Sequence, residues 1–183
     1  MRKKLFGGSI LPAIILAAAV LAYVWFLSRP PEPFDPAELT PAETLEAYPG
    51  TELSLEIDGH VLNVTFQNNS DSWLSSGATI DENKHLFLYG GLAVLLDGRW
   101  YQVPHKDIAT AGVGLELAPG DSVPGAFSFT AYDALPDGQY RIPYGYWTFD
   151  PASDQSHRTN PYYESYVTFA IQNGKYLPFD FTS

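Results

Sequence analysis

Side chains that commonly carry chemistry are few in this sequence, and they are widely spaced. None of the histidines lies in a His-Glu-x-x-His or comparable metal-binding spacing; they are His60, His85, His105 and His157. The chain has no cysteine to act as a nucleophile or thiolate ligand, no Gly-x-Ser-x-Gly nucleophile elbow and no glycine-rich phosphate loop. Asp133 with Asp137, and Asp150 with Asp154, could offer oxygen ligands to Ca²⁺, but their spacing is typical of turns rather than of an EF-hand loop. The sequence therefore predicts no catalytic residues, no metal site and no cofactor.

Aromatic side chains are concentrated around residues 150–161. The rings that flank this loop are Tyr144, Tyr146, Trp147, Phe149, Tyr162, Tyr163 and Tyr166. Exposed Tyr and Trp rings can stack on sugars or anchor a protein partner. The candidate binding residues are therefore Trp147, Tyr146, Tyr162 and Tyr163, with Trp73 as a separate candidate. The alternative is that about half of these rings face the core and the others shield sheet edges.

β-strands are the elements that must position these rings. Apolar and polar residues alternate over residues 52–57 and again over residues 60–67. Asp58-Gly59 lies between the two runs and predicts a tight hairpin. With this dipeptide as the two-residue loop, Leu55 pairs with Leu62, and both apolar sets lie on one side of the sheet.

A second hairpin is predicted at Asp97-Gly98, where the flanking residues are apolar on both faces. With this dipeptide as the loop, Val94 pairs with Tyr101. Further alternating runs lie at residues 113–117, 127–129, 139–149 and 162–172. Short strands separated by turn signals predict an all-β fold, a β-sandwich of about seven or eight strands over residues 51–183.

The segment Leu-Pro-Asp-Gly-Gln-Tyr at residues 135–140 is a more specific signal. Immunoglobulin-like sandwiches often begin their sixth strand with a tyrosine whose hydroxyl bonds to backbone a few residues upstream, a tyrosine corner. Asp137, Gly138 and Tyr140 are therefore predicted structural residues. Ile142 takes the position of the second core cysteine of antibody domains and can fill the core without a disulfide. The alternative is that Tyr140 is an ordinary strand tyrosine.

The first 28 residues predict a short cytoplasmic stub and a membrane anchor. Three basic residues at positions 2–4 precede an uncharged stretch, residues 5–27. As a transmembrane helix this stretch would be about 34 Å long, enough to cross a hydrocarbon core of about 30 Å. The basic residues before it predict a cytoplasmic N-terminus and an extracellular C-terminal domain. A signal peptide cleaved after Ala22 is the alternative, and it would export the same domain.

Residues 29–50 contain six prolines and predict a stiff stalk. Thr40, Pro41 and Glu43 fit the N-cap, the first helical position and a capping box, so a short helical turn is expected there. All 21 acidic residues lie beyond residue 28, which makes the exported part more acidic than the net charge of -11 for the whole chain. This balance argues against nucleic acid as a partner and is typical of a soluble, self-repelling surface.

The order of these signatures resembles a family of bacterial Ig-like domains on membrane-anchored or lipid-anchored surface proteins of Gram-positive bacteria. The stretches that carry the resemblance are residues 61–70, 96–104, 115–120 and 135–142, and the most specific is Asp-Gly-Arg-Trp-Tyr-Gln-Val-Pro, residues 97–104. The resemblance implies no catalytic residues, because such domains generally have no assigned enzymatic activity. Many relatives are lipoproteins, whereas this chain has no cysteine, so its anchor would be the helix.

These observations predict a non-catalytic module at the bacterial cell membrane that mediates protein interaction or acts as a spacer. The alternative is a glycan-binding module that uses the aromatic cluster around loop 150–161. The expected partners are the lipid bilayer, through residues 5–27, and an envelope protein or a glycan. Nucleic acid is not an expected partner.

Overall fold

The computed structural model describes residues 15–21, 23, 29–80, 85–109, 112–152 and 160–179. The chain divides into two compact units, Met1–Glu32 and Pro33–Ser183. Residues 15–21 of the first unit are helical and exposed. No helix among the described residues is long and apolar enough to cross a membrane. Most of the predicted span, residues 5–27, lies outside the described residues.

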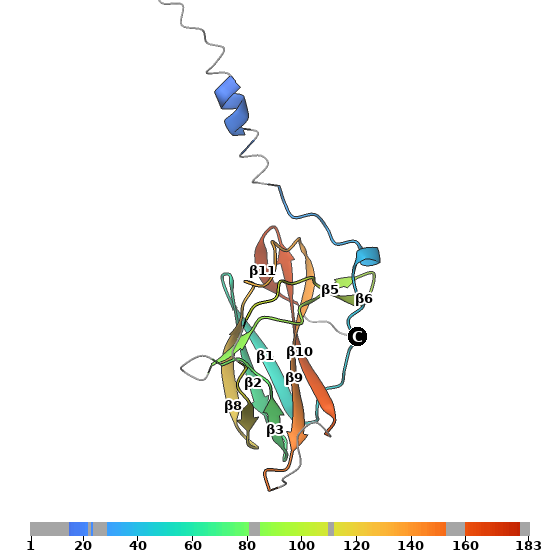
Figure 1. The fold of residues 1–183 in the computed structure, drawn as a ribbon, viewed down its shortest axis with the longest axis vertical. Helices are drawn as coiled ribbons and strands as arrows, with labels where there is room; N and C mark the ends of the chain where they lie inside the picture. Colours follow the sequence, from blue (N-terminus) through green and yellow to red (C-terminus); the bar gives the residue numbers. More distant parts are fainter. Residues whose placement is uncertain are drawn as a thin grey trace, which may run out of the picture. The chain divides into compact units, whose positions relative to one another are not determined.

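The second unit is built from two β-sheets (Figure 1). The four-stranded sheet has the order β1-β2-β8-β4, from β1 (Thr51–Asp58), β2 (Val61–Asn68), β8 (Ser122–Phe127) and β4 (Leu86–Leu88). The path of the seven-stranded sheet is β11-β10-β9-β3-β7, from β11 (Lys175–Pro178), β10 (Tyr162–Gln172), β9 (Gly138–Phe149), β3 (Trp73–Ser76) and β7 (Leu115–Leu117). Its remaining strands, β5 (Ala93–Leu96) and β6 (Arg99–Gln102), form a hairpin whose β5 also pairs with β9. The predicted all-β, two-sheet fold is confirmed, with 11 strands in the described residues instead of seven or eight.

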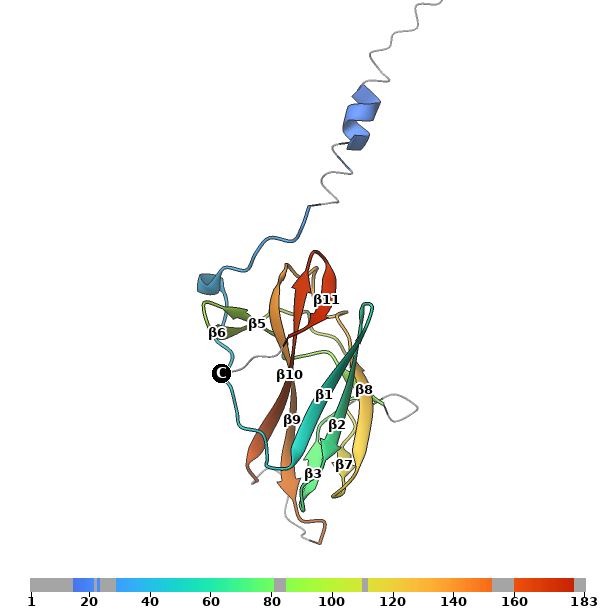
Figure 2. The same cartoon turned by 180° about the vertical axis from the view of Figure 1, so that it is seen from behind.

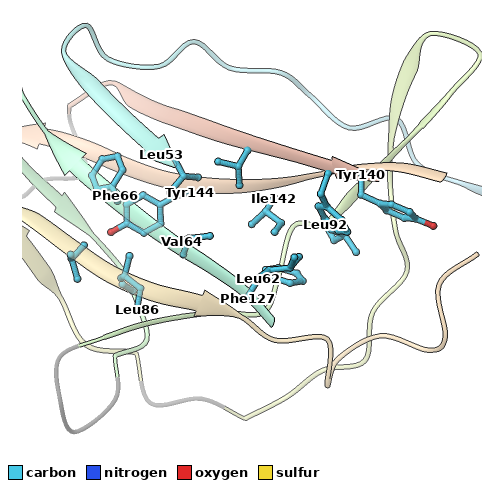
Figure 3. Close-up of a cluster of buried hydrophobic side chains, with 14 of the residues drawn as sticks. Leu53, Leu62, Val64, Phe66, Leu86, Leu92, Phe127, Tyr140, Ile142 and Tyr144 are labelled. Atoms are coloured by element: carbon cyan, nitrogen blue, oxygen red, sulfur yellow. The ribbon is translucent and has the colours of Figure 1, made fainter. Parts of the chain in front are cut away.

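The core lies between the two sheets and is filled by alternate residues of their longest strands. Figure 3 shows Ile142 and Tyr144 of β9 pointing toward Leu62, Val64 and Phe66 of β2. The rings of Phe66 and Tyr144 are 4.5 Å apart, and Ile142 is completely buried. An isoleucine therefore fills the centre of this cysteine-free sandwich.

The Asp97-Gly98 hairpin has the predicted register. Both residues have positive φ, 50° and 77°, as a type I′ turn requires, and Val94 pairs with Tyr101. A further hairpin, at Asn173-Gly174, also has two positive φ angles and joins β10 to β11. This hairpin and the very short β4 account for part of the difference in strand number.

The predicted pairing of the first hairpin was wrong. Its loop is Gly59-His60, so Leu55 pairs with Val64 rather than with Leu62. Only Gly59 has a positive φ in this turn, and Asp58 still belongs to the strand, where it pairs with Val61. Because each residue's partner moves by two positions, the apolar sets still share one face.

Tyr140 is completely buried, and its hydroxyl donates a 2.6 Å hydrogen bond to the carbonyl oxygen of Pro136. Burial raises the pKa of this phenol. The carboxylate of Asp137 accepts bonds from the backbone N–H groups of Asn173, at 2.7 Å, and Gly174, at 3.4 Å. These contacts fix the start of β9 against the β10–β11 turn.

Residues 33–50 of the segment predicted as a stalk belong to the second unit, where Phe34, Leu39 and Tyr48 pack against its hydrophobic core. Its helical turn is η1 (Pro36–Glu38), a single 3₁₀ turn capped by Asp35, and not a turn that begins at Thr40. Residues 40–48, which we call the strap, continue beside the seven-stranded sheet (Figure 2). The strap exchanges backbone hydrogen bonds with β6, from Gln102 N–H to Thr40 and from Ala42 N–H to Trp100.

Candidate functional site

The outer face of the seven-stranded sheet carries the exposed part of the aromatic cluster. Along β9 the even-numbered residues from 140 to 146 are buried in the core. The odd-numbered residues therefore point outward, and next to them lie the outward residues of β10. The resulting set is Arg141, Pro143, Gly145, Trp147, Tyr162, Glu164 and Tyr166.

Trp147 and Tyr162 form an aromatic pair on this face. They are cross-strand partners, and their ring centroids are 4.9 Å apart at an interplanar angle of 53°. The Tyr162 ring lies directly over Gly145, where any Cβ atom would overlap the tyrosine hydroxyl. Tyr162 is 42% exposed, and partial burial together with neighbouring Glu164 raises its pKa to about 12. Gly145 therefore allows a large ring to lie flat on the strand.

A hollow of about 370 Å³ opens beside this pair. Its floor is β9 from Pro143 to Gly145, and its wall is formed by residues 76–79 and 87–91. A second hollow, of about 350 Å³, shares Pro143, Tyr162 and Glu164 with the first and extends to the strap. We call the two together the outer groove.

Arg141 closes the strap end of the outer groove and is only 4% exposed. Its guanidinium lies 4.8 Å from the Trp100 ring centre and 4.4 Å from that of Tyr166. The two terminal nitrogens donate 2.7 Å hydrogen bonds to the Thr44 hydroxyl and to the Glu43 carbonyl oxygen. Burial lowers the pKa of this guanidinium, and nearby Tyr166 and Glu164 oppose that shift. Arg141 thus holds the strap by one side-chain and one main-chain oxygen.

Tyr166 links the strap to the carboxylate of the groove. Its hydroxyl accepts a 2.9 Å bond from the Leu45 N–H and donates a 2.5 Å bond to Glu164 Oε2. Burial is the main reason that its pKa rises to about 12. Glu164 and Glu43 are the acidic residues that line the second hollow, and Glu164 lies close enough to Arg141 to raise the pKa of its guanidinium, although the hydrogen bonds of Arg141 go to the strap.

The other sequence candidates are not exposed platforms. Tyr146 is completely buried, with its hydroxyl 2.6 Å from the Thr51 hydroxyl and 3.0 Å from the Ser165 hydroxyl. Tyr163 is half-buried against Tyr48, at 5.1 Å between ring centres.

Trp73 is also partly buried, and its ring centre lies 6.0 Å from that of Phe149. The structure therefore pairs Trp147 with Tyr162 on the outer face, and it stacks Tyr146 on Tyr163, with ring centroids 6.2 Å apart, on the other side of the sheet. Sequence reasoning missed Arg141, Gly145 and Glu164, although strand alternation places all three on the outer face. Residues 153–159 of the aromatic loop lie outside the described residues.

Among the histidines and aspartates singled out by the sequence, His60, His105 and Asp133 have contacts away from the outer groove. The His60 ring packs against Tyr176, and the His105 ring against Tyr132. Asp133 pairs with Lys106 at 2.5 Å on the surface. Among the described residues no group of three His, Cys, Asp or Glu side chains could hold a metal ion.

Comparison of the chain with models of protein families, with curated proteins and with solved structures finds no match.

Proposed function

We propose that this protein is a non-catalytic, immunoglobulin-like binding module that stands outside the bacterial cell membrane and engages an envelope protein through the outer groove. The observation that carries the proposal is the Trp147–Tyr162 pair, held over Gly145 beside a hollow of about 370 Å³. Aromatic anchors beside a concave surface are typical of protein-binding hot spots.

Two further observations support the immunoglobulin-like type. The Tyr140 hydroxyl bonds to the Pro136 carbonyl oxygen at the start of β9, in the manner of a tyrosine corner. Ile142, at the centre of the sandwich, occupies a position where antibody domains carry a core cysteine.

The amino-acid sequence of the first 28 residues supports a position at the membrane. Residues 5–27 are uncharged, follow three basic residues and are long enough for one span. All of the acidic residues lie on the other side of this stretch, where they would keep the module soluble and away from anionic polymers.

Capture from bacterial membranes tests the protein-binding role. The variant Trp147→Ala combined with Tyr162→Ala should weaken capture of a partner by about 2 kcal/mol or more, roughly thirtyfold in Kd. Trp73→Ala removes the ring of the first residue of β3, away from the outer groove. It serves as the matched control, and capture should be unchanged. Equal capture by both variants would exclude this face, and a chain that captures nothing acts as a spacer.

Glycan binding is the second candidate, because the exposed Tyr162 ring lies beside the Glu164 carboxylate and could stack on a sugar while the carboxylate accepts hydroxyl bonds. Retention on insoluble cell-wall polysaccharide separates the two functions. If the wild-type chain is retained and Trp147→Ala is not, the glycan role replaces the protein-binding role.

A further inference from the structure

The seven-stranded sheet contains a gap at the floor of the outer groove. β10 pairs with β9 from Gly138 to Trp147 on one side. On the other side β5 pairs at residues 140–141 and β3 at residues 147–149. Among the described residues no strand pairs with residues 142–146 on this side, and no loop hydrogen bond ends on their backbone.

The backbone groups of Gly145 point into this gap. Gly145 pairs in register with Glu164, whose N–H turns away from β9 and donates to the Glu46 carbonyl oxygen of the strap at 3.3 Å. In an antiparallel pair the two residues either exchange both bonds or both face away from each other. Gly145 therefore directs its N–H and C=O away from β10, toward the hollow lined by residues 76–79 and 87–91.

Pro143 lies two residues earlier, so its nitrogen faces the same side. A proline at this position removes no bond from the β9–β10 ladder, because its missing N–H would have pointed into the gap. Within the part of the chain that the structure describes, no strand fills this gap, since β3 ends at Ser76 and β5 begins only at Ala93. The gap thus presents one N–H donor, from Gly145, between two acceptors, the carbonyl oxygens of Pro143 and Gly145.

We propose that this gap binds about three residues of an extended, basic peptide from the partner protein, which pairs with Gly145 as an inserted strand and places a Lys or Arg side chain beside Glu164. The inference rests on the proposed function and specifies its ligand. An inserted strand would satisfy the Gly145 groups with main-chain bonds, and Trp147 and Tyr162 would cover its outer side.

Charge selects the basic side chain. Glu164 lines both hollows and Glu43 lines the second, whereas Arg141, the basic residue of this lining, lies near Glu164 but donates its terminal N–H groups to the strap. The surrounding domain carries the whole acidic excess of the chain. An acidic peptide would therefore be repelled, whereas a Lys or Arg would form a charge-assisted bond with a groove carboxylate.

Amide exchange and peptide titration test the proposal on the full-length chain in detergent micelles, followed by ¹⁵N NMR. Without peptide, the Gly145 amide should exchange with solvent far faster than the amides of Tyr144 and Tyr146, which face β10. A capped peptide of alternating valine and lysine should shift the Gly145 amide and slow its exchange at least about tenfold. The same peptide with glutamate for lysine, or with N-methylated backbone nitrogens, should bind at least about tenfold more weakly.

Two variants locate the contact. Glu164→Gln should weaken the lysine peptide by about tenfold, whereas Glu56→Gln, an exposed change on β1 of the other sheet, should not. A slowly exchanging Gly145 amide in the unbound chain, equal binding of the N-methylated peptide, or shifts confined to another surface would each overturn the inserted-strand proposal. So would a shift of the Gly145 amide by an N-acetylglucosamine oligomer but not by peptide. These outcomes leave capture of a protein by Trp147 and Tyr162 as a separate result, so the two proposals can fail independently.

Discussion

Arg141 holds the strap through two hydrogen bonds from a buried guanidinium. A buried guanidinium is usually matched by a carboxylate, yet both terminal nitrogens of Arg141 donate to uncharged oxygens of the strap, and two aromatic rings lie against its faces. The charge is therefore stabilised by ring faces and hydrogen bonds together. Removal of this side chain takes the donors from two strap oxygens in a partly buried setting.

Arg141→Met keeps much of the side-chain volume but removes the donors. We expect it to lower the free energy of unfolding by about 2 kcal/mol and to make residues 40–48 susceptible to protease, because the strap loses its central contact. Urea unfolding and limited proteolysis measure the two effects. Lys175→Met, an exposed change on β11, is the control. If residues 40–48 of Arg141→Met resist protease as well as those of the wild type, the backbone hydrogen bonds to β6 are enough to hold the strap in place.

Buried tyrosines make stability depend on pH above 10. Burial raises the pKa of Tyr144, and partial burial together with Glu164 that of Tyr166, to about 12 in the folded protein, against 10.0 for the unfolded chain. Between pH 10 and 12 the unfolded state therefore loses protons that the folded state keeps, so stability falls as pH rises. The slope is up to about 1.4 kcal/mol per pH unit for each such group.

Titration followed at 295 nm, with urea midpoints measured in parallel, checks the alkaline prediction. Tyr144→Phe also loses the 2.7 Å bond to the Ser76 hydroxyl, but it should flatten the decline because one titrating group is gone. A constant urea midpoint from pH 9 to 12 would contradict the expected burial of these phenols.

At the scale of elements, β4 and β8 show why some pairings were not predicted. They form a parallel pair of only three residues, and Gly125 of β8 approaches Leu86 of β4 so closely that a Cβ atom would overlap the leucine backbone and side chain. Nothing in the three residues of β4 distinguishes them from a loop, because parallel pairing joins segments that are distant along the chain. The contact depends on a residue without a side chain.

Gly125→Ala should therefore be strongly destabilising, by about 2 kcal/mol or more, since backbone atoms must move to make room for the methyl group. Gly114→Ala is the matched control, because a Cβ there meets nothing within 4 Å and the glycine does not have a positive φ. Its expected effect on stability is within about 0.5 kcal/mol. Thermal unfolding of the two variants compares them directly.

The elements that were predicted correctly are those whose signal is local. Asp97-Gly98 determines its own turn type, and the alternation along β9 and β10 separates core residues from surface residues without knowledge of the fold. The Gly59-His60 loop shows the limit of this approach, because Asp58-Gly59 can place its glycine at either loop position and the choice moves each partner by two. The density of aromatic residues identified Trp147, Tyr162 and Tyr146 as candidates. The alternation of inward and outward residues along the strands is what distinguishes the two outward rings from buried Tyr146.

At the scale of the whole molecule, the largest difference between prediction and structure is the strap. Proline content predicted an extended stalk over residues 29–50, and residues 40–48 are indeed without helix. Whether an extended segment stands in solvent or lies on a sheet depends on distant residues such as Arg141 and Tyr166, which the local sequence does not specify. The gap at Gly145 also depends on residues that are distant in the sequence and was therefore not predicted. It exists because β3 pairs with β9 only at residues 147–149 and β5 only at residues 140–141.

The membrane attachment that we propose depends on the N-terminal segment. Residues 5–27 would cost little to bury in lipid, whereas cleavage after Ala22 would leave only a few apolar residues ahead of the β-sheet domain. In bacterial cells we therefore expect the full 183-residue chain in the membrane fraction, resistant to a high-salt wash and released by detergent. Intact-mass spectrometry and fractionation measure this, and a chain lacking residues 1–28, exported with an unrelated signal peptide, is the soluble control. A mature protein that begins at Tyr23 and is found in the medium would show instead that the module acts at a distance from the cell that secretes it.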